Sequence, residues 1–157
     1  MKLLTYSLCF VVVFCYVSHA QNYYVKNESN PRDGSFAVYM VNNYVTPQLQ
    51  LSAGIIQTSS GERMHILASH YTGYDRFGAQ SIHLTIDNET ITLDRIVNRQ
   101  RNNNHEVVGF KTDRELLRKL GNAQNITMHL RGNWSIEQEI DRDHIRRFGE
   151  FYYKHMR

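Results

Sequence analysis

The amino-acid sequence predicts a mainly β or α+β fold: an antiparallel, β-sandwich-like sheet with one short helix and one C-terminal helix. Three observations lead to this prediction. Apolar and polar residues alternate along many short segments, as in strands that bury one face. Tyrosine, phenylalanine and β-branched residues, which favour strands, are abundant. Helical spacing of apolar residues occurs only late in the chain, which argues against a doubly wound parallel sheet.

The expected strands follow from this alternation and from the turn-forming residues between the segments. Residues 22–34 are polar and indicate a loose arm or an edge strand. Further strands are expected at about 36–45, 49–55, 64–69, 106–110, 125–132 and 134–140, and residues 81–97 should form two strands around the turn Asp87-Asn88-Glu89. The expected inward-facing residues are Leu49, Leu51, Ala53 and Ile55, then Met64, Ile66 and Ala68, then Ile82, Leu84 and Ile86, and finally Ile126, Met128 and Leu130.

Two helices are expected in the last third of the chain. The segment TDRE indicates a capping box with Thr112 as N-cap and Glu115 at N3, so a short helix should run over about 113–120. Gly121 would end this helix in a left-handed conformation. The second helix should follow Asp141 and cover about 142–155. Its apolar stripe consists of Ile145, Phe148 and Tyr152.

Residues 1–20 have the pattern of a secretory signal peptide: Lys2, then a mostly apolar core of about 15 residues, then Ser18-His19-Ala20. This core is shorter than the roughly 20 residues that a membrane-spanning helix needs. Cleavage would leave residues 21–157 as a single secreted or periplasmic β-rich domain with no transmembrane segment. That domain would contain no cysteine, which excludes thiol catalysis and cysteine-bound zinc. It would carry 17 basic and 15 acidic side chains, so nucleic acid is not an expected partner.

The segment GFKTDRELLRKLGNAQNITMHLRG, followed by the closing helix, resembles small uncharacterised secreted bacterial β-sandwich proteins with a C-terminal helix. The resemblance covers residues 105–155. It implies a scaffold of strand, short helix, strand and final helix, and it implies no catalytic residue.

The segment HYTGYDRFG (70–78) combines aromatic and charged side chains in a glycine-bearing loop. Exposed aromatic rings beside arginine are typical of recognition surfaces for a peptide or a sugar. The alternative is that the rings fold back and cover one end of the sheet. The candidate binding residues are His70, Tyr71, Tyr74, Asp75, Arg76 and Phe77.

The seven histidines of residues 21–157 offer no metal motif with the usual ligand spacing. His83 and His129 both fall on the polar side of their strands, and they could meet and bind a metal only if these strands were neighbours. Two solvent-facing histidines are the alternative, so the sequence assigns no metal, no cofactor and no catalytic residue. A hydrolase whose polar residues, such as His70 and Asp75, converge from separate loops stays open as the alternative function.

Two further features concern the surface. Arg99 and Arg101 precede three asparagines, which indicates a solvated turn between strands; the alternative is contact with an anionic glycan, which heparin retention would reveal. Asn88, at the expected hairpin tip, would be a glycosylation acceptor in a eukaryotic secretory route. Together these patterns predict a secreted or periplasmic, non-catalytic binding or interaction module whose partner is an unknown protein, peptide or glycan.

Overall fold

The computed structural model describes residues 23–102 and 104–156, so the predicted signal peptide at 1–20 lies outside the described residues. The described chain forms an antiparallel sheet of ten strands and two helices, which confirms the predicted fold class. The strand order is β1-β2-β4-β5-β8-β7-β6-β9-β10, and β3 pairs with β4. The elements are β1 (Tyr24–Ser29), β2 (Phe36–Val41), β3 (Tyr44–Thr46), β4 (Leu49–Gln57), β5 (Arg63–Thr72), β6 (Ser81–Ile86), β7 (Glu89–Asn102), β8 (His105–Thr112), α1 (Arg114–Asn122), β9 (Ile126–Arg131), β10 (Ser135–Ile140) and α2 (Arg142–His155).

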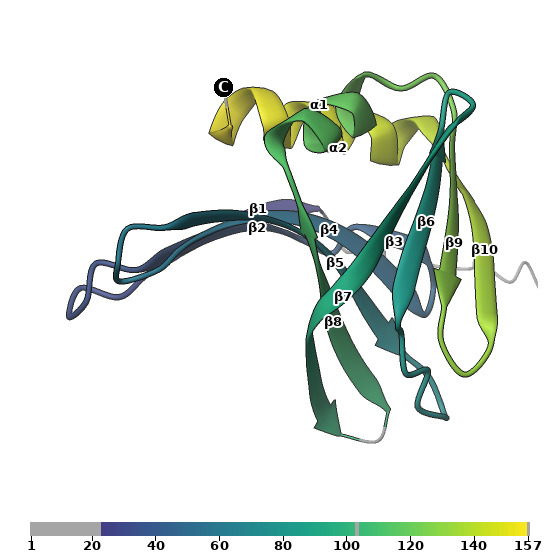
Figure 1. Ribbon diagram of the computed structural model, residues 1–157, viewed down its shortest axis with the longest axis horizontal. Coiled ribbons are helices and arrows are strands. Elements are labelled where there is room, and N and C mark those ends of the chain that lie inside the picture. Colours follow the sequence, from purple (N-terminus) through teal and green to yellow (C-terminus); the bar gives the residue numbers. More distant parts are fainter. Residues whose placement is uncertain (1–22, 103, 157) are drawn as a thin grey trace, which may run out of the picture.

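The sheet bends into two layers, and the 14-residue strand β7 runs from one layer into the other (Figure 1). Its first part, up to Asp94, pairs with β6, and its second part, from Arg95, pairs with β8. The register shifts between Arg95 and Val97, and such bulges bend a strand and increase its twist. We call β1, β2, β3, β4, β5, β8 and the second part of β7 the N-terminal layer. The first part of β7 with β6, β9 and β10 is the C-terminal layer.

The core lies between these layers and the two helices, which lie together on one side of the bent sheet (Figure 1). The predicted inward residues of β4, β6 and β9 are all buried, and so is the predicted stripe of α2. The helices cross at Gly121 and Gly149, where a Cβ added to Gly121 would lie 2.5 Å from the Cα of Gly149. Glycine at both positions therefore lets the two backbones touch.

The predicted inward face of β5 is wrong. Met64, Ile66 and Ala68 are only half-buried, whereas Leu67 is fully buried. β5 carries apolar residues on both faces, so alternation alone does not identify the inner one. The register decides it, because Leu67 lies opposite Ala53 on the inward face of β4.

The predicted strand at 36–45 is interrupted. Asn42 adopts a positive φ of 60°, a conformation in which asparagine is enriched, and the chain continues as the separate strand β3. Asn43 is fully buried there, and its side-chain amide donates to the carbonyl of Leu51 at 2.7 Å. The polar arm before this strand contains the edge strand β1, and the turn at Asp87 and Asn88 has the positive φ values of a tight hairpin.

Two details of the α1 prediction are also wrong. The N-cap is Asp113, whose carboxylate accepts from the amide of Leu116 at 2.7 Å, because Thr112 is still held in β8 opposite His65. Gly121 does not end the helix, which continues to Asn122. No helix within residues 23–102 and 104–156 is long and apolar enough to cross a membrane.

Candidate functional site

The six residues of the candidate loop 70–78 are distributed over different environments. Tyr71 and Phe77 are buried, whereas Tyr74 is 90% exposed. Asp75 and Arg76 are also exposed. His70 precedes Tyr71 on β5 and therefore faces the opposite side of the sheet, where its ring centroid lies 6.4 Å from that of His105. The loop thus contributes two rings to the interior and presents one ring and two charges to solvent.

The two buried rings belong to a cluster with Trp134, which precedes β10. The ring centroids of Tyr71 and Phe77 lie 5.4 Å apart. Trp134 stands edge-on to both, at 6.0 Å from Tyr71 and 5.0 Å from Phe77. These separations and angles are those that aromatic pairs prefer. The cluster therefore joins the end of β5 to the hairpin between β9 and β10.

A buried carboxylate holds the loop in place. Glu106, at the start of β8, is 3% exposed. Its two oxygens accept from the backbone amides of Gly78 at 2.7 Å and Ala79 at 3.1 Å, and from the side-chain amide of Asn98 at 2.9 Å. Three donors replace the water that this carboxylate loses on burial. Because Gly78 and Ala79 directly follow Phe77, these hydrogen bonds also fix the position of Phe77.

The hairpin between β9 and β10 is hydrogen-bonded to the same loop. The backbone amide of Asn133 donates to the carbonyl of Phe77 at 2.7 Å, and its side chain donates to the carbonyl of Arg76 at 2.9 Å. A Cβ added to Gly132 would lie 2.4 Å from the carbonyl oxygen of Phe77 and 2.9 Å from its ring. Glycine is therefore required at this position for the two segments to approach.

Beside this cluster lies a cleft of about 400 Å³, which we call the aromatic cleft. Its walls come from both layers of the sheet: the β3–β4 turn and the end of β5 on one side, and the start of β10 on the other. No charged side chain is among the described residues that line it. The lining residues are Thr46, Pro47, Gln48, Tyr71, Trp134 and Ile136.

The aromatic cleft contains one residue of the predicted loop, Tyr71, and several that sequence reasoning missed. Trp134 is the only tryptophan of the chain and is 39% exposed. Its position in the segment GNW, at a turn, was a signal that an exposed ring was present. Gln48 carried no such signal, because its place beside Tyr71 depends on the pairing of β4 with β5.

A second cavity, of about 350 Å³, lies between α1 and the start of β7. Its apolar lining includes Ile91 and Leu116, and much of the remaining lining is charged. Lys119 pairs with Glu89 at 2.9 Å and so ties α1 to β7. The lining residues are Ile91, Leu93, Lys111, Thr112, Asp113, Glu115, Leu116 and Lys119.

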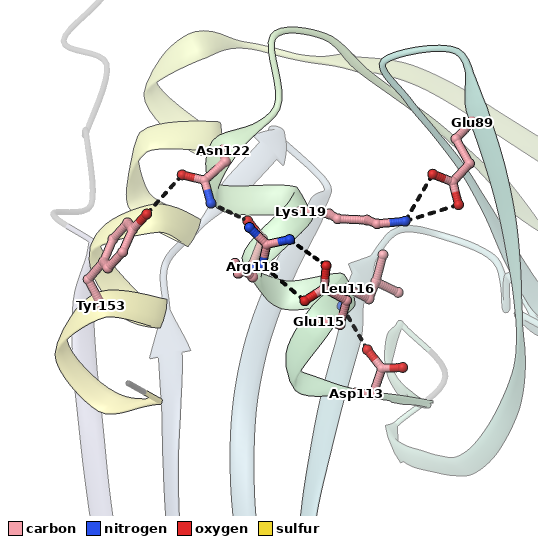
Figure 2. Close-up of polar contacts among 8 residues, drawn as sticks. All are labelled: Glu89, Asp113, Glu115, Leu116, Arg118, Lys119, Asn122 and Tyr153. Atoms are coloured by element: carbon pink, nitrogen blue, oxygen red, sulfur yellow. Dashed lines mark hydrogen bonds and ion pairs between the residues drawn. The ribbon is translucent and has the colours of Figure 1, made fainter.

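Further polar contacts along α1 are internal to the helix or reach α2 (Figure 2). Arg118 binds Glu115 through two hydrogen bonds, one of them 2.9 Å long, and the side chain of Asn122 donates to the carbonyl of Arg118 at 2.8 Å. The hydroxyl of Tyr153 donates to the side-chain oxygen of Asn122 at 3.0 Å. These groups are occupied in holding the helices, so we regard the aromatic cleft as the candidate site.

The basic stretch is not a turn. Arg99 lies within β7 opposite Val107, and the strand extends to Asn102, which pairs with His105. Pairing with β8 therefore keeps Arg99 within the sheet. Arg99 is exposed, and the side chain of Arg101 lies outside the described residues. Asn88 is exposed at the hairpin tip where the sequence places it.

Of the histidines, His83 and His129 are directly opposite each other on β6 and β9. In the described residues no group of three or more histidine, cysteine, aspartate and glutamate side chains is placed to hold a metal ion.

Comparisons with protein-family models, curated proteins and solved structures find no match to this chain. The resemblance to secreted bacterial β-sandwich proteins therefore stays a prediction.

Proposed function

We propose that the protein is an exported, non-catalytic binding protein whose ligand occupies the aromatic cleft. The observation that carries this proposal is the wall formed by Tyr71 and the partly exposed Trp134, in a cleft lined by uncharged residues. Small-molecule sites are mostly apolar concavities of roughly 300–1,000 Å³ with a few polar groups that orient the ligand. The aromatic cleft has this size and composition.

The polar groups of the cleft restrict the ligand class. The side-chain amide of Gln48 lines the cleft and can both donate and accept, while its backbone amide donates to the hydroxyl of Thr46 at 3.3 Å. Thr46 adds a hydroxyl group at the same rim. A neutral ligand with one apolar ring face and a polar edge would satisfy both walls. A sugar unit of a glycan, or a peptide side chain of comparable shape, has this chemistry.

Trp134 makes the test direct, because it is the only tryptophan and its fluorescence therefore reports on the cleft alone. We would titrate the protein with neutral oligosaccharides and with proline- and tyrosine-containing peptides. A ligand should change the emission of Trp134 and saturate. Trp134→Ala should then abolish binding when it is followed by calorimetry. Tyr74→Ala is the matched control, since Tyr74 belongs to the same loop but is not part of the cleft lining.

Two results would contradict the proposal. A ligand that binds Trp134→Ala as tightly as the original protein would place the site elsewhere. Conversion of a bound glycan or peptide into products would favour the hydrolase alternative. Whether oligosaccharides or peptides give a saturating change in fluorescence decides which of the two ligand classes the cleft binds.

The export part of the proposal depends on the first twenty residues alone. Sequencing of the N-terminus of the native protein should begin at Gln21. A native chain that still begins at Met1 or Lys2 would remove the secreted or periplasmic location, while leaving the aromatic cleft unaffected.

A further inference from the structure

A row of four polar residues crosses the outer face of the C-terminal layer. The register places Thr92 of β7 opposite His83 of β6, His83 opposite His129 of β9, and His129 opposite Glu137 of β10. The residues on either side of the two histidines along β6 and β9 are fully or almost fully buried. Because side chains alternate across a strand, the row faces away from the core.

One ring nitrogen of His83 has a hydrogen-bond partner and the other has none in the described residues. Its Nδ1 lies 2.8 Å from the hydroxyl oxygen of Thr92. Its Nε2 is shielded from solvent and has no hydrogen-bond partner within residues 23–102 and 104–156. Metal-bound histidines usually donate their other ring N–H to an oxygen acceptor such as a carboxylate, a backbone carbonyl or water, which fixes the tautomer and orients the ring. The hydroxyl oxygen of Thr92 can take this role for His83. If Nδ1–H donates to Thr92, then Nε2 carries the free lone pair.

The ring opposite His83 is that of His129. Its ring centroid lies 6.0 Å from that of His83, and the ring planes are inclined at 44°. Neither nitrogen of His129 makes a hydrogen bond to any part of the chain that the structure describes. One ion at about 2.0–2.1 Å from a nitrogen of each ring would fit between rings at this separation.

We propose that His83 and His129 form a two-histidine site for a late first-row divalent transition metal, with water filling the other positions. Imidazole suits copper, nickel and zinc, and the intrinsic order of affinity places Cu²⁺ first. Glu137 lies next to His129 in the row and Glu139 lies on the same face, so two carboxylates add negative charge on the β10 side. The sequence raised this pair only on the condition that the two strands were neighbours, and the pairing of β6 with β9 meets that condition.

The metal site does not rest on the proposed function. Ile136 faces the aromatic cleft, while its neighbour Glu137 faces the metal row, so the two sites lie on opposite sides of β10. Ligand binding in the cleft and metal binding on the outer face can therefore succeed or fail separately.

The test is calorimetric titration of the chelator-treated protein with Cu²⁺ and with Zn²⁺. We expect one equivalent to bind. His83→Gln and His129→Gln should each lower the metal affinity to that of the double variant, in which both histidines are replaced. Thr92→Val keeps both ligands but removes the group that orients His83, and it should weaken binding by about tenfold or more. Circular dichroism of each variant establishes that the fold is retained.

His105→Gln is the matched control, because His70 and His105 are another pair of neighbouring histidine rings on the sheet. This variant should still bind one equivalent of metal at His83 and His129. Nitrogen NMR of the histidine side chains gives a second measurement: Zn²⁺ should shift Nε2 of His83 and leave Nδ1 in its protonated position. Binding that survives both His83→Gln and His129→Gln, or that disappears only in His105→Gln, would overturn the inference.

Discussion

Replacement of Glu106 should loosen the candidate site while leaving the rest of the sheet formed. Glu106→Ala removes the acceptor of the buried backbone amides of Gly78 and Ala79. A buried donor without a partner lowers the free energy of unfolding by about 1–3 kcal/mol, so the loss of acceptors for both amides would lower it by roughly 2–6 kcal/mol. Because alanine also relieves the desolvation of the carboxylate, and water can enter the space, we expect a loss of about 3 kcal/mol.

Urea unfolding followed by circular dichroism measures this loss, and amide hydrogen exchange locates it. Glu106→Gln keeps one acceptor oxygen and should cost less than alanine, about 1–2 kcal/mol. Glu62→Ala, an exposed glutamate in the turn after β4, should change the free energy of unfolding by less than about 0.5 kcal/mol. In Glu106→Ala, exchange at Gly78 and Ala79 should accelerate. A loss below about 1 kcal/mol with these amides still protected would refute the assignment of Glu106 as the anchor.

Two further predictions concern close packing and pH. Gly132→Ala should destabilise the protein by about 1–3 kcal/mol in the same urea assay, because its Cβ would lie 2.4 Å from the carbonyl oxygen of Phe77; unchanged stability would show that the hairpin can move away. Burial lowers the pKa of His65 and of His155 below the ordinary 6.5, with smaller contributions from Arg114 and Lys154 respectively. The unfolded chain then takes up these protons more readily, so the melting temperature should fall as the pH drops through about 6.5 and below. The double replacement of both histidines by glutamine should flatten this dependence between pH 7.5 and 5.5, and an equally steep decline would exclude them as its source.

The parts of the fold that could be predicted are those determined by local pattern. Leu49, Leu51 and Ala53 alternate with polar or small residues, so their common face was evident, and the stripe of α2 followed from helical spacing. Asn88 was placed correctly because tight hairpins need residues that tolerate a positive φ.

The parts that could not be predicted depend on pairing between distant segments. β5 has apolar side chains on both faces, and only its register with β4 makes Leu67 the inward residue. Arg99 precedes an asparagine run that favours a turn, yet pairing with β8 keeps it in a strand. Trp134 and Gln48 are far apart in sequence, so no local pattern could place them in the same cleft as Tyr71.

The shared strand β7 has a consequence for the width of the aromatic cleft. Tyr71 and Gln48 belong to the N-terminal layer, and Trp134 belongs to the C-terminal layer. The bend of β7 after Arg95 sets the angle between the two layers. A small change in that angle, made far from the cleft, would spread or narrow the gap between the tyrosine and the tryptophan. We therefore expect substitutions at this register shift to change the width of the aromatic cleft, and with it the size of ligand that fits, although these residues do not line the cleft.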